Sequence, residues 1–316
     1  MTPAEACRHF PAARGARSCA PLRSGHIHES WLADRRWVVQ RCNTAVFADL
    51  EAVMENMTLV CSVVSPELAP IAADDGSLLW RDGAGGCWRV IPFVGGTVAA
   101  TRADAFEVAR GLGDWHAKAA SIDPSRLRVT LPGFHDPPRR LDVLRSTAAG
   151  RGCPELDRIE ALARWAVRLP GEARVAHFDA KVENFLLDEG TRRVRALVDL
   201  DTVMPGSWLW DVGDLARSAT GTAAEDSADG MGFDARVWEE LLGGYLSAAG
   251  RYLTDEERTW LDDAPLVATL EQAVRFLTDH LAGDVYYRVE RPGHNLDRCR
   301  AQLALLDSMI AERSRR

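Results

Sequence analysis

The most informative part of the chain reads His177-Phe178-Asp179-Ala180-Lys181-Val182-Glu183-Asn184. Two further segments follow it closely, Val198-Asp199-Leu200-Asp201 and Trp210-Asp211-Val212-Gly213-Asp214. A single aspartate in a turn usually does no more than stabilise that turn. Aspartate, lysine and asparagine at this spacing, followed by an apolar strand that ends in aspartate, instead indicate a chemical site.

These residue types match the needs of phosphoryl transfer, which depends on positioning and charge neutralisation. Asp179 is the predicted base for the proton of an attacking hydroxyl, and Lys181 is placed to meet γ-phosphoryl oxygens. Asn184 and Asp199 are predicted to ligate Mg²⁺, which prefers oxygen ligands and often takes only one or two from protein. A loop would carry Asp179 and Asn184, and a hairpin would return Asp199 beside them.

Three side chains in the same segments are predicted to support this site. His177 is expected to bond backbone carbonyls under the catalytic turn rather than to act as a ligand. Asp211 and Asp214 lie on the turn into the next helix, where they would brace the loop or cap the helix.

Composition narrows the class of protein. The 316 residues carry a net charge of −8, which argues against a general nucleic-acid binder. We find no apolar run near 18 residues and no secretory signal at the N-terminus, so we expect no membrane association. The seven cysteines are scattered, with no Cys-x-x-Cys pair, which favours reduced thiols over a zinc site. We therefore expect a cytoplasmic protein, as a monomer or weak dimer.

Hydrophobic periodicity predicts two lobes. In the N-terminal lobe, residues 1–95, we expect a strand at 37–41, an amphipathic helix at 48–64 and a hairpin that turns at 82–86. Gly95-Gly96 would form a flexible joint. The C-terminal lobe, residues 96–316, reads as mainly helical, with helices near 106–116, 156–166 and from 237 to the end, and a hairpin over 185–198. The fold class is therefore α+β, with a β-rich lobe and a larger helical lobe.

The central segments resemble the aminoglycoside phosphotransferase-like superfamily of small-molecule kinases, which shares the bilobal protein-kinase-like fold. Protein kinases use a similar catalytic loop, but here Asp199-Leu200-Asp201 stands in place of Asp-Phe-Gly and no Ala-Pro-Glu follows. A protein substrate is therefore not expected.

The resemblance narrows to N-acetylhexosamine 1-kinases and covers roughly residues 22 to 310. Stretches outside the general kinase motifs carry it: Gln40–Phe47, Trp88–Phe93, Phe134–Pro137 with Arg139 and Arg140, Val198–Ser207, Trp210–Asp214 with Arg217, Arg275–Asp279, Gly283–Tyr287 and His294–Arg298. It implies ATP- and Mg²⁺-dependent phosphorylation of the anomeric hydroxyl of N-acetylglucosamine or N-acetylgalactosamine.

Three positions depart from that family. Its phosphate loop usually reads Gly-His-Ile-Asn, whereas this chain has Gly25-His26-Ile27-His28-Glu29-Ser30. Ser218 stands where an aromatic residue is common, which implies an altered or enlarged sugar pocket. Val212 replaces a usual phenylalanine, a milder change in packing.

The resemblance also suggests binding residues. For ATP these are Gly25 in a turn near the phosphates, and Arg41 where kinases place a strand lysine. Arg41 would pair with Glu55, or Glu51, on the following helix. A surface arginine is the alternative, with Gln40 facing inward if the register shifts by one. For the sugar the residues are His26, Arg275, Asp279 and Tyr286, although Arg275 and Asp279 could form only an i,i+4 ion pair.

Three functions remain open from the sequence. The first is a sugar 1-kinase with ATP as co-substrate and Mg²⁺ as cofactor. The second is a kinase of another hydroxylated small molecule, such as an aminoglycoside or a natural-product sugar, which His28, Glu29 and Ser218 motivate. The third is a nucleotide-binding pseudokinase scaffold, which the complete Asp179, Lys181, Asn184 and Asp199 set disfavours.

Overall fold

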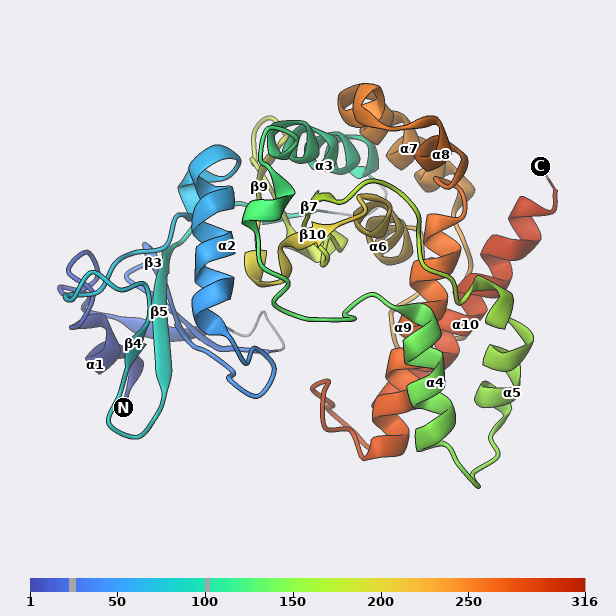
Figure 1. Cartoon of the computed structure of the whole chain (residues 1–316), viewed down its shortest axis with the longest axis horizontal. Helices are drawn as coiled ribbons and strands as arrows, with labels where there is room; N and C mark the ends of the chain where they lie inside the picture. The colour runs from blue at the N-terminus through green and yellow to red at the C-terminus, as the bar shows by residue number, and fades with distance from the viewer. Residues whose placement is uncertain (23–26, 100–102, 316) are drawn as a thin grey trace.

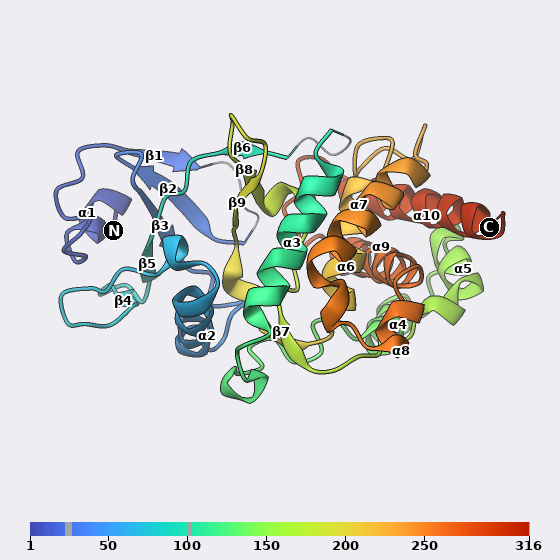
Figure 2. The ribbon, with the colours of Figure 1, turned by 90° about the horizontal axis from the view of Figure 1, so that it is seen from above.

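A computed structural model describes residues 1–22, 27–99 and 103–315 of the chain. The molecule has a small β-rich lobe and a larger helical lobe, arranged along its long axis (Figure 1). The N-terminus lies in the small lobe and the C-terminus at the opposite end of the molecule (Figure 2). The two-lobed α+β architecture expected from the sequence is therefore present. No helix in these ranges is both long and apolar enough to cross a membrane.

The small lobe is built on an antiparallel sheet, five-stranded within the described ranges, in the order β1-β2-β3-β5-β4. Its strands are β1 (Cys19–Leu22), β2 (Glu29–Ala33), β3 (Trp37–Arg41), β4 (Trp80–Arg81) and β5 (Cys87–Pro92). Helix α1 (Pro3–Cys7) packs on one face, in a cluster that includes Val39 and Val90. Because side chains alternate along a strand, Gln40 and Arg89 point to the opposite face.

Helix α2 (Leu50–Val63) stands between this sheet and the large lobe (Figure 1). The Asp49 side chain caps it by accepting a hydrogen bond from the Ala52 amide at 2.9 Å. The amide nitrogen of buried Asn56 donates to the carbonyls of Arg128, at 2.8 Å, and Val203, at 2.9 Å. One side chain of α2 thus holds backbone of the large lobe directly.

The connection between the lobes is tightly packed at Gly96. Strand β6 (Thr97–Val98) follows immediately and pairs with β8 (Phe185–Leu187) of the large lobe. A Cβ atom at Gly96 would lie 2.9 Å from the Leu187 carbonyl oxygen. The structure therefore gives Gly96 a packing role, since close approach to β8 leaves no room for a side chain.

The described part of the large lobe surrounds two small antiparallel sheets, one of two strands and one of three, which includes β6. Strand β7 (Arg174–Ala176) pairs with β10 (Met204–Gly206), and β8 pairs with β9 (Val194–Leu197). The α-helices of this lobe are α3 (Ala105–Ala119), α4 (Pro137–Thr147), α5 (Pro154–Ala161), α6 (Leu209–Ala219), α7 (Ala235–Ala249), α8 (Asp255–Thr259), α9 (Ala264–Ala282) and α10 (His294–Arg313). Short 3₁₀ turns complete the description: η1 (Pro66–Leu68), η2 (Pro124–Arg126), η3 (Ala163–Trp165), η4 (Val182–Asn184), η5 (Leu200–Thr202) and η6 (Gly250–Tyr252).

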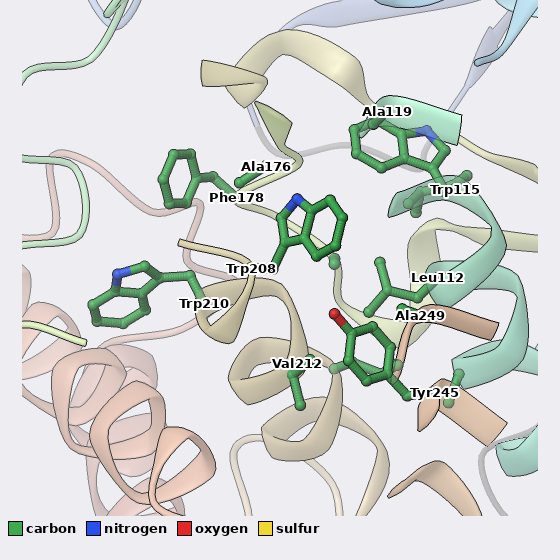
Figure 3. Close-up of a cluster of buried hydrophobic side chains, with 14 of the residues drawn as sticks. Leu112, Trp115, Ala119, Ala176, Phe178, Trp208, Trp210, Val212, Tyr245 and Ala249 are labelled. Carbon is green, nitrogen blue, oxygen red and sulfur yellow. The ribbon is translucent and has the colours of Figure 1, made fainter. Parts of the chain in front are cut away.

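Trp208 lies at the centre of the main hydrophobic core, between the catalytic segment and α3 (Figure 3). Its indole nitrogen donates to the Val175 carbonyl at 2.7 Å, so β7 is held from behind. The ring of His116 on α3 stacks on it with ring centroids 4.3 Å apart. The core thereby supports the loop that begins where β7 ends.

Candidate active site

The loop after β7 gathers the predicted catalytic groups around one carboxylate. Lys181 Nζ donates to Asp179 Oδ2 at 2.7 Å, and Asn184 Nδ2 donates to the same oxygen at 2.9 Å. Asn184 Nδ2 also lies 2.7 Å from the Asp179 carbonyl oxygen. These contacts fix the carboxylate of Asp179 relative to a lysine cation and to the side chain of Asn184.

Asp199 enters the same region at the end of the β8–β9 hairpin. The amide of Val198 donates to the Asn184 carbonyl at 2.9 Å, which places the residue before Asp199 beside Asn184. Asp199 has a left-handed backbone, with φ of 69°, a conformation that a non-glycine residue keeps only when its surroundings enforce it. Burial, followed by the neighbouring carboxylates of Asp201 and Asp179, raises the pKa of Asp199 to about 6.

Lys181 provides the opposite charge. Burial acts to lower the pKa of its amine, but the carboxylates of Asp179 and Asp199 outweigh burial and raise that pKa above its usual value. Lys181 therefore stays protonated across the physiological range. A fixed ammonium beside Asp179 is suited to contacting phosphoryl oxygens.

The donor set fits a magnesium ion that shares its coordination with a nucleotide. Within the described part of the chain, no group of three or more His, Cys, Asp and Glu side chains is placed to hold a metal. Asn184 and Asp199 can offer an amide and a carboxylate oxygen, and Mg²⁺ is commonly bound through one or two such groups together with phosphates and water. The carboxylates of Asp201 and Asp179 also lie near Asp199, so a cation bound here would meet several negative charges.

Asp211, in the first turn of α6, holds the backbone of the catalytic loop. Its carboxylate accepts from the amide of His177 at 2.7 Å and from that of Phe178 at 2.6 Å. His116 Nε2 lies 2.8 Å from the same carboxylate, and His116 Nδ1 lies 2.9 Å from the Tyr245 hydroxyl. A buried charge needs such partners, and here they fix the loop two residues before Asp179.

His177 bonds backbone groups on both sides of the site. Its Nε2 lies 3.1 Å from the Val198 carbonyl oxygen, and its Nδ1 accepts from the Asp179 amide at 3.3 Å. Because a carbonyl can only accept, Nε2 carries the hydrogen. Burial lowers the pKa of His177, which favours this neutral tautomer.

Asp214 does not have either role predicted for it. It lies inside α6 and binds Arg217 one turn later, with the Asp214 Oδ1 to Arg217 Nη2 distance at 2.7 Å. Burial opposes ionisation of Asp214, but Arg217 outweighs it and holds the pKa of that carboxyl below its usual value. The i,i+3 spacing of Asp214 and Arg217 on one helix face explains the difference.

The structure does not bring together the two predicted ATP-binding residues that it describes, Arg41 and Glu55. Gly25 lies outside the described residues. Arg41 is exposed, and its Nη1 lies 3.5 Å from Glu29 Oε2. Glu55 Oε2 lies 3.6 Å from Arg128 Nη1. The expected Arg41–Glu55 pair is therefore not formed, nor the alternative with Glu51, which binds Arg81 at 2.5 Å. The alternation of β3 turns Arg41 outward, so Gln40 is the side chain that faces inward.

Arg89 on β5 is a charged residue of this region that the sequence analysis did not assign. Its side chain is 1% exposed and forms a two-pronged ion pair with Asp201, with the Nη2 to Oδ2 distance at 2.6 Å. Its Nε donates to Gln40 Oε1 at 2.8 Å. An arginine at the inward position of an otherwise apolar strand, Cys87–Pro92, was the available signal.

The predicted sugar-binding residues also separate. His26 lies outside the described residues. Asp279 is buried and its carboxylate accepts from the backbone amides of Val285, Tyr286 and Tyr287 at 2.8–2.9 Å. Asp279 therefore holds the backbone of the loop that follows α9, and the ion pair with Arg275 is not formed among the described residues.

Arg275 on α9 lies among aromatic rings. Its guanidinium is 4.8 Å from the ring centroid of Phe134, 5.8 Å from that of Tyr286 and 5.6 Å from that of Tyr287. The neighbouring His135 connects this region to the catalytic loop, since its Nε2 lies 3.0 Å from the Phe178 carbonyl oxygen. Arg275 and Tyr286 thus belong to a surface that adjoins Asp179.

Ser218 bonds the backbone of the catalytic loop. Its hydroxyl oxygen accepts from the Val182 amide at 2.9 Å and donates to the Leu215 carbonyl at 3.0 Å. The side chain is therefore directed at the backbone of the catalytic loop, where it satisfies the first amide of η4.

Comparison with known proteins agrees with this arrangement. The family model described as the phosphotransferase enzyme family matches residues 18–258. The chain belongs to this family. The match includes the sheet, the catalytic loop and α6, so it takes in every group gathered around Asp179.

Similar solved structures have the same fold. The GDP complex of aminoglycoside 2'-phosphotransferase-IIIa is 13% identical, with a TM-score of 0.62 over 92% of this chain and 93% of that one. Choline kinase from Cryptosporidium parvum Iowa II is 12% identical, with a TM-score of 0.62 over 98% and 96%. A choline/ethanolamine kinase family protein from Mesorhizobium loti is 18% identical, with a TM-score of 0.61 over 98% and 96%. The predicted protein-kinase-like fold is confirmed.

Proposed function

We propose that this protein is an ATP- and Mg²⁺-dependent small-molecule kinase that phosphorylates the anomeric hydroxyl of an N-acetylhexosamine. The observation that carries the proposal is the contact of both Lys181 and Asn184 with Asp179 Oδ2, next to the hairpin strand that brings Asp199 beside Asn184. Membership of the phosphotransferase enzyme family supports the reaction class.

Each side chain has a distinct task in this proposal. Asp179 accepts the proton of the sugar hydroxyl as that oxygen attacks the γ-phosphorus, and Lys181 balances negative charge on the transferred group. Asn184 and Asp199 would hold Mg²⁺, which neutralises phosphate charge and aligns the triphosphate when bound. Asp211 and His177 keep the loop backbone in place, so that Asp179 does not have to reorganise during the reaction.

The nucleotide assignment draws support from similar structures. Relatives of the same fold are described as complexes with GDP, with ADP and spectinomycin, and with ATP and streptomycin. We infer that a nucleotide also binds between the lobes of this chain, near the inward-facing Gln40 and the Asp199 turn. ATP is the proposed phosphoryl donor.

The charge of the acceptor side favours a neutral sugar over a cationic one. Arg275 lies among three rings, and Arg140 on α4 donates to the Phe134 carbonyl at 2.9 Å. Burial, followed by the positive charge of Arg275, lowers the pKa of Arg140. Two cations disfavour the ammonium groups of an aminoglycoside, whereas guanidinium N–H groups suit the carbonyl oxygen of an acetamido group.

A substrate panel tests the proposal. Purified protein with ATP and Mg²⁺ is incubated separately with N-acetylglucosamine, N-acetylgalactosamine, the parent hexoses and kanamycin, and products are identified by phosphorus NMR. A sugar 1-phosphate from the N-acetylhexosamines is the expected result. Phosphorylation of kanamycin alone, or of a sugar at another oxygen, would contradict the proposed acceptor while keeping the reaction class.

A further inference from the structure

The buried pair of Arg89 and Asp201 joins the two lobes across the proposed nucleotide site. Arg89 lies on strand β5 of the small lobe, and Asp201 lies in η5 of the large lobe. Both side chains are at most 4% exposed, and both nitrogens of the guanidinium fork contact Asp201. A two-pronged contact of this kind fixes orientation as well as distance.

Further groups complete the pair. Gln40 accepts from Arg89 Nε at 2.8 Å, and Nε2 of His28 lies 3.2 Å from Asp201 Oδ2. His28 Nδ1 accepts from the Asn43 amide at 3.0 Å, so Nε2 carries the ring hydrogen, although Nε2 completes no hydrogen bond within the described part of the chain. Buried ion pairs are tolerated when additional hydrogen bonds satisfy the partners. Here Gln40 on β3 bonds Arg89, and His28, just before β2, lies against Asp201.

The segment that Arg89 holds contains the proposed metal ligand. Asp201 is two residues after Asp199, whose left-handed backbone must be enforced by its surroundings. On the large-lobe side, the Thr202 hydroxyl donates to the His177 carbonyl at 2.7 Å. The Asp199 turn is thus fixed from the large lobe through Thr202 and from the small lobe through Arg89.

We propose that Arg89 is a positioning residue that sets the carboxylate of Asp199 for the metal–nucleotide complex by holding Asp201 from the small lobe. This inference rests on the proposed function. Because of the Arg89–Asp201 pair, the orientation of the Asp199 carboxylate depends on the contact between the two lobes. On β3, Arg41 points outward and Gln40 is uncharged, whereas Arg89 on β5 is a cation that faces inward. The N–H groups of Arg89 are directed at Asp201 and Gln40.

The experiment measures binding of a fluorescent ATP analogue to the full chain, with Mg²⁺ and in EDTA. Loss of a group that orients a metal ligand typically weakens metal affinity about 10- to 100-fold. In Arg89→Lys and Asp201→Asn we expect Mg²⁺ to lose that much of its effect on nucleotide affinity, while metal-free binding stays within about threefold of wild type. Arg81→Lys, a matched change in a surface ion pair on neighbouring β4, should alter neither.

A double variant, Arg89→Met with Asp201→Asn, keeps the test decisive if a single variant unfolds. It removes both buried charges, so it should melt closer to wild type than Arg89→Met alone. Its loss of Mg²⁺ effect should equal that of one single variant rather than the product of two. Multiplied losses, or weaker nucleotide binding in EDTA, would show direct phosphate contact by Arg89 and overturn the proposal.

Failure of this inference is distinguishable from failure of the proposed function. Unchanged Mg²⁺ dependence in Arg89→Lys, Asp201→Asn and the double variant, with wild-type protein that binds Mg²⁺–nucleotide, overturns only the role of Arg89. A wild-type protein that binds no nucleotide under either condition overturns both.

Discussion

Asp179 receives hydrogen bonds from Lys181 and Asn184 on one oxygen, so its carboxylate is already oriented without substrate. Asp179→Asn keeps the shape but removes the proton acceptor. We expect turnover to fall about 10²- to 10⁴-fold, with nucleotide affinity close to wild type. Initial rates by a coupled ADP assay, beside nucleotide titration, measure both quantities.

The control for this variant is Asp188→Asn, in the turn between β8 and β9. Asp188 also accepts several hydrogen bonds, from the amides of Gly190 and Thr191, but it lies in an exposed turn. Its turnover should match wild type. Near-normal turnover of Asp179→Asn would remove Asp179 from the role of base.

The pKa of Asp199 gives a pH dependence with a definite sign. Folding raises this pKa from 3.8 to about 6, so the folded protein binds more protons than the unfolded chain between those values. The contribution of Asp199 to the free energy of unfolding therefore falls as pH rises from about 4 to about 6. Because Mg²⁺ competes with that proton, the gain in Tm from Mg²⁺–nucleotide should be larger at about pH 7.5 than at about pH 5.

The corresponding measurement is thermal unfolding with and without Mg²⁺ at the two pH values. Asp199→Asn with the same nucleotide corrects for titration of the nucleotide itself. If wild type and Asp199→Asn show the same pH dependence, the raised pKa of Asp199 does not govern metal binding.

Single residues also show where sequence reasoning reached its limit. The spacing from His177 to Asn184 is local, so Asp179, Lys181 and Asn184 could be placed together from the chain alone. Arg41 and Gln40 differ by one position on β3, and the sequence pattern did not decide which of them faces inward. Arg89 meets Asp201 across 112 positions, and no local pattern predicts such a contact.

Helices α3 and α7 approach closely because of Gly244. A Cβ atom there would lie 2.2 Å from the Phe106 carbonyl oxygen on α3. Gly244→Ala should therefore lower the free energy of unfolding by about 1–3 kcal/mol through overpacking. Urea unfolding monitored by tryptophan fluorescence measures the change.

The adjacent Gly243 is a matched control on the same helix. It is exposed, and a Cβ atom there would meet only ordinary contacts, the nearest at 3.8 Å from the Phe106 ring. Gly243→Ala should raise stability by about 0.5–1 kcal/mol, since alanine is the better helix former. Equal effects of the two substitutions would show that the helices are not in the close contact described here.

At the level of elements, apolar spacing predicted β3, α2 and the β8–β9 hairpin well, because each has a regular pattern of buried side chains. The Gly95-Gly96 pair was interpreted as a flexible joint, whereas Gly96 packs against Leu187. Glycine permits both flexibility and close approach, and only the neighbouring strand distinguishes them.

Asn56 connects the lobes at a second point, through the backbone of Arg128 and Val203. Asn56→Ala would leave the buried Val203 carbonyl and the partly buried backbone groups of Arg128 without this partner, at a cost of about 1–3 kcal/mol. We expect faster amide hydrogen exchange in α2 and in the segment around Val203, together with weaker nucleotide affinity. Ser62→Ala, which removes an exposed hydroxyl of the same helix, should change neither quantity.

Hydrogen exchange by mass spectrometry separates the outcomes for Asn56. Faster exchange confined to α2 would show a local effect, and unchanged exchange in both segments would contradict a connection between the lobes. For the whole molecule, the sequence predicted two lobes because strand patterns are frequent before about residue 95 and helical patterns dominate after it. It did not predict how the lobes are held together, since Asn56 and Arg89 act on partners far along the chain.

The hydroxyl of Ser218 has a practical consequence for anyone wishing to redesign acceptor preference. It accepts a hydrogen bond from the amide of Val182 in the catalytic loop. A bulky aromatic side chain at this position would therefore displace the loop and would not simply line a sugar cavity. Engineering effort belongs instead on Arg275 and Tyr286, for which the structure gives ring contacts with each other and with Phe134 and Tyr287.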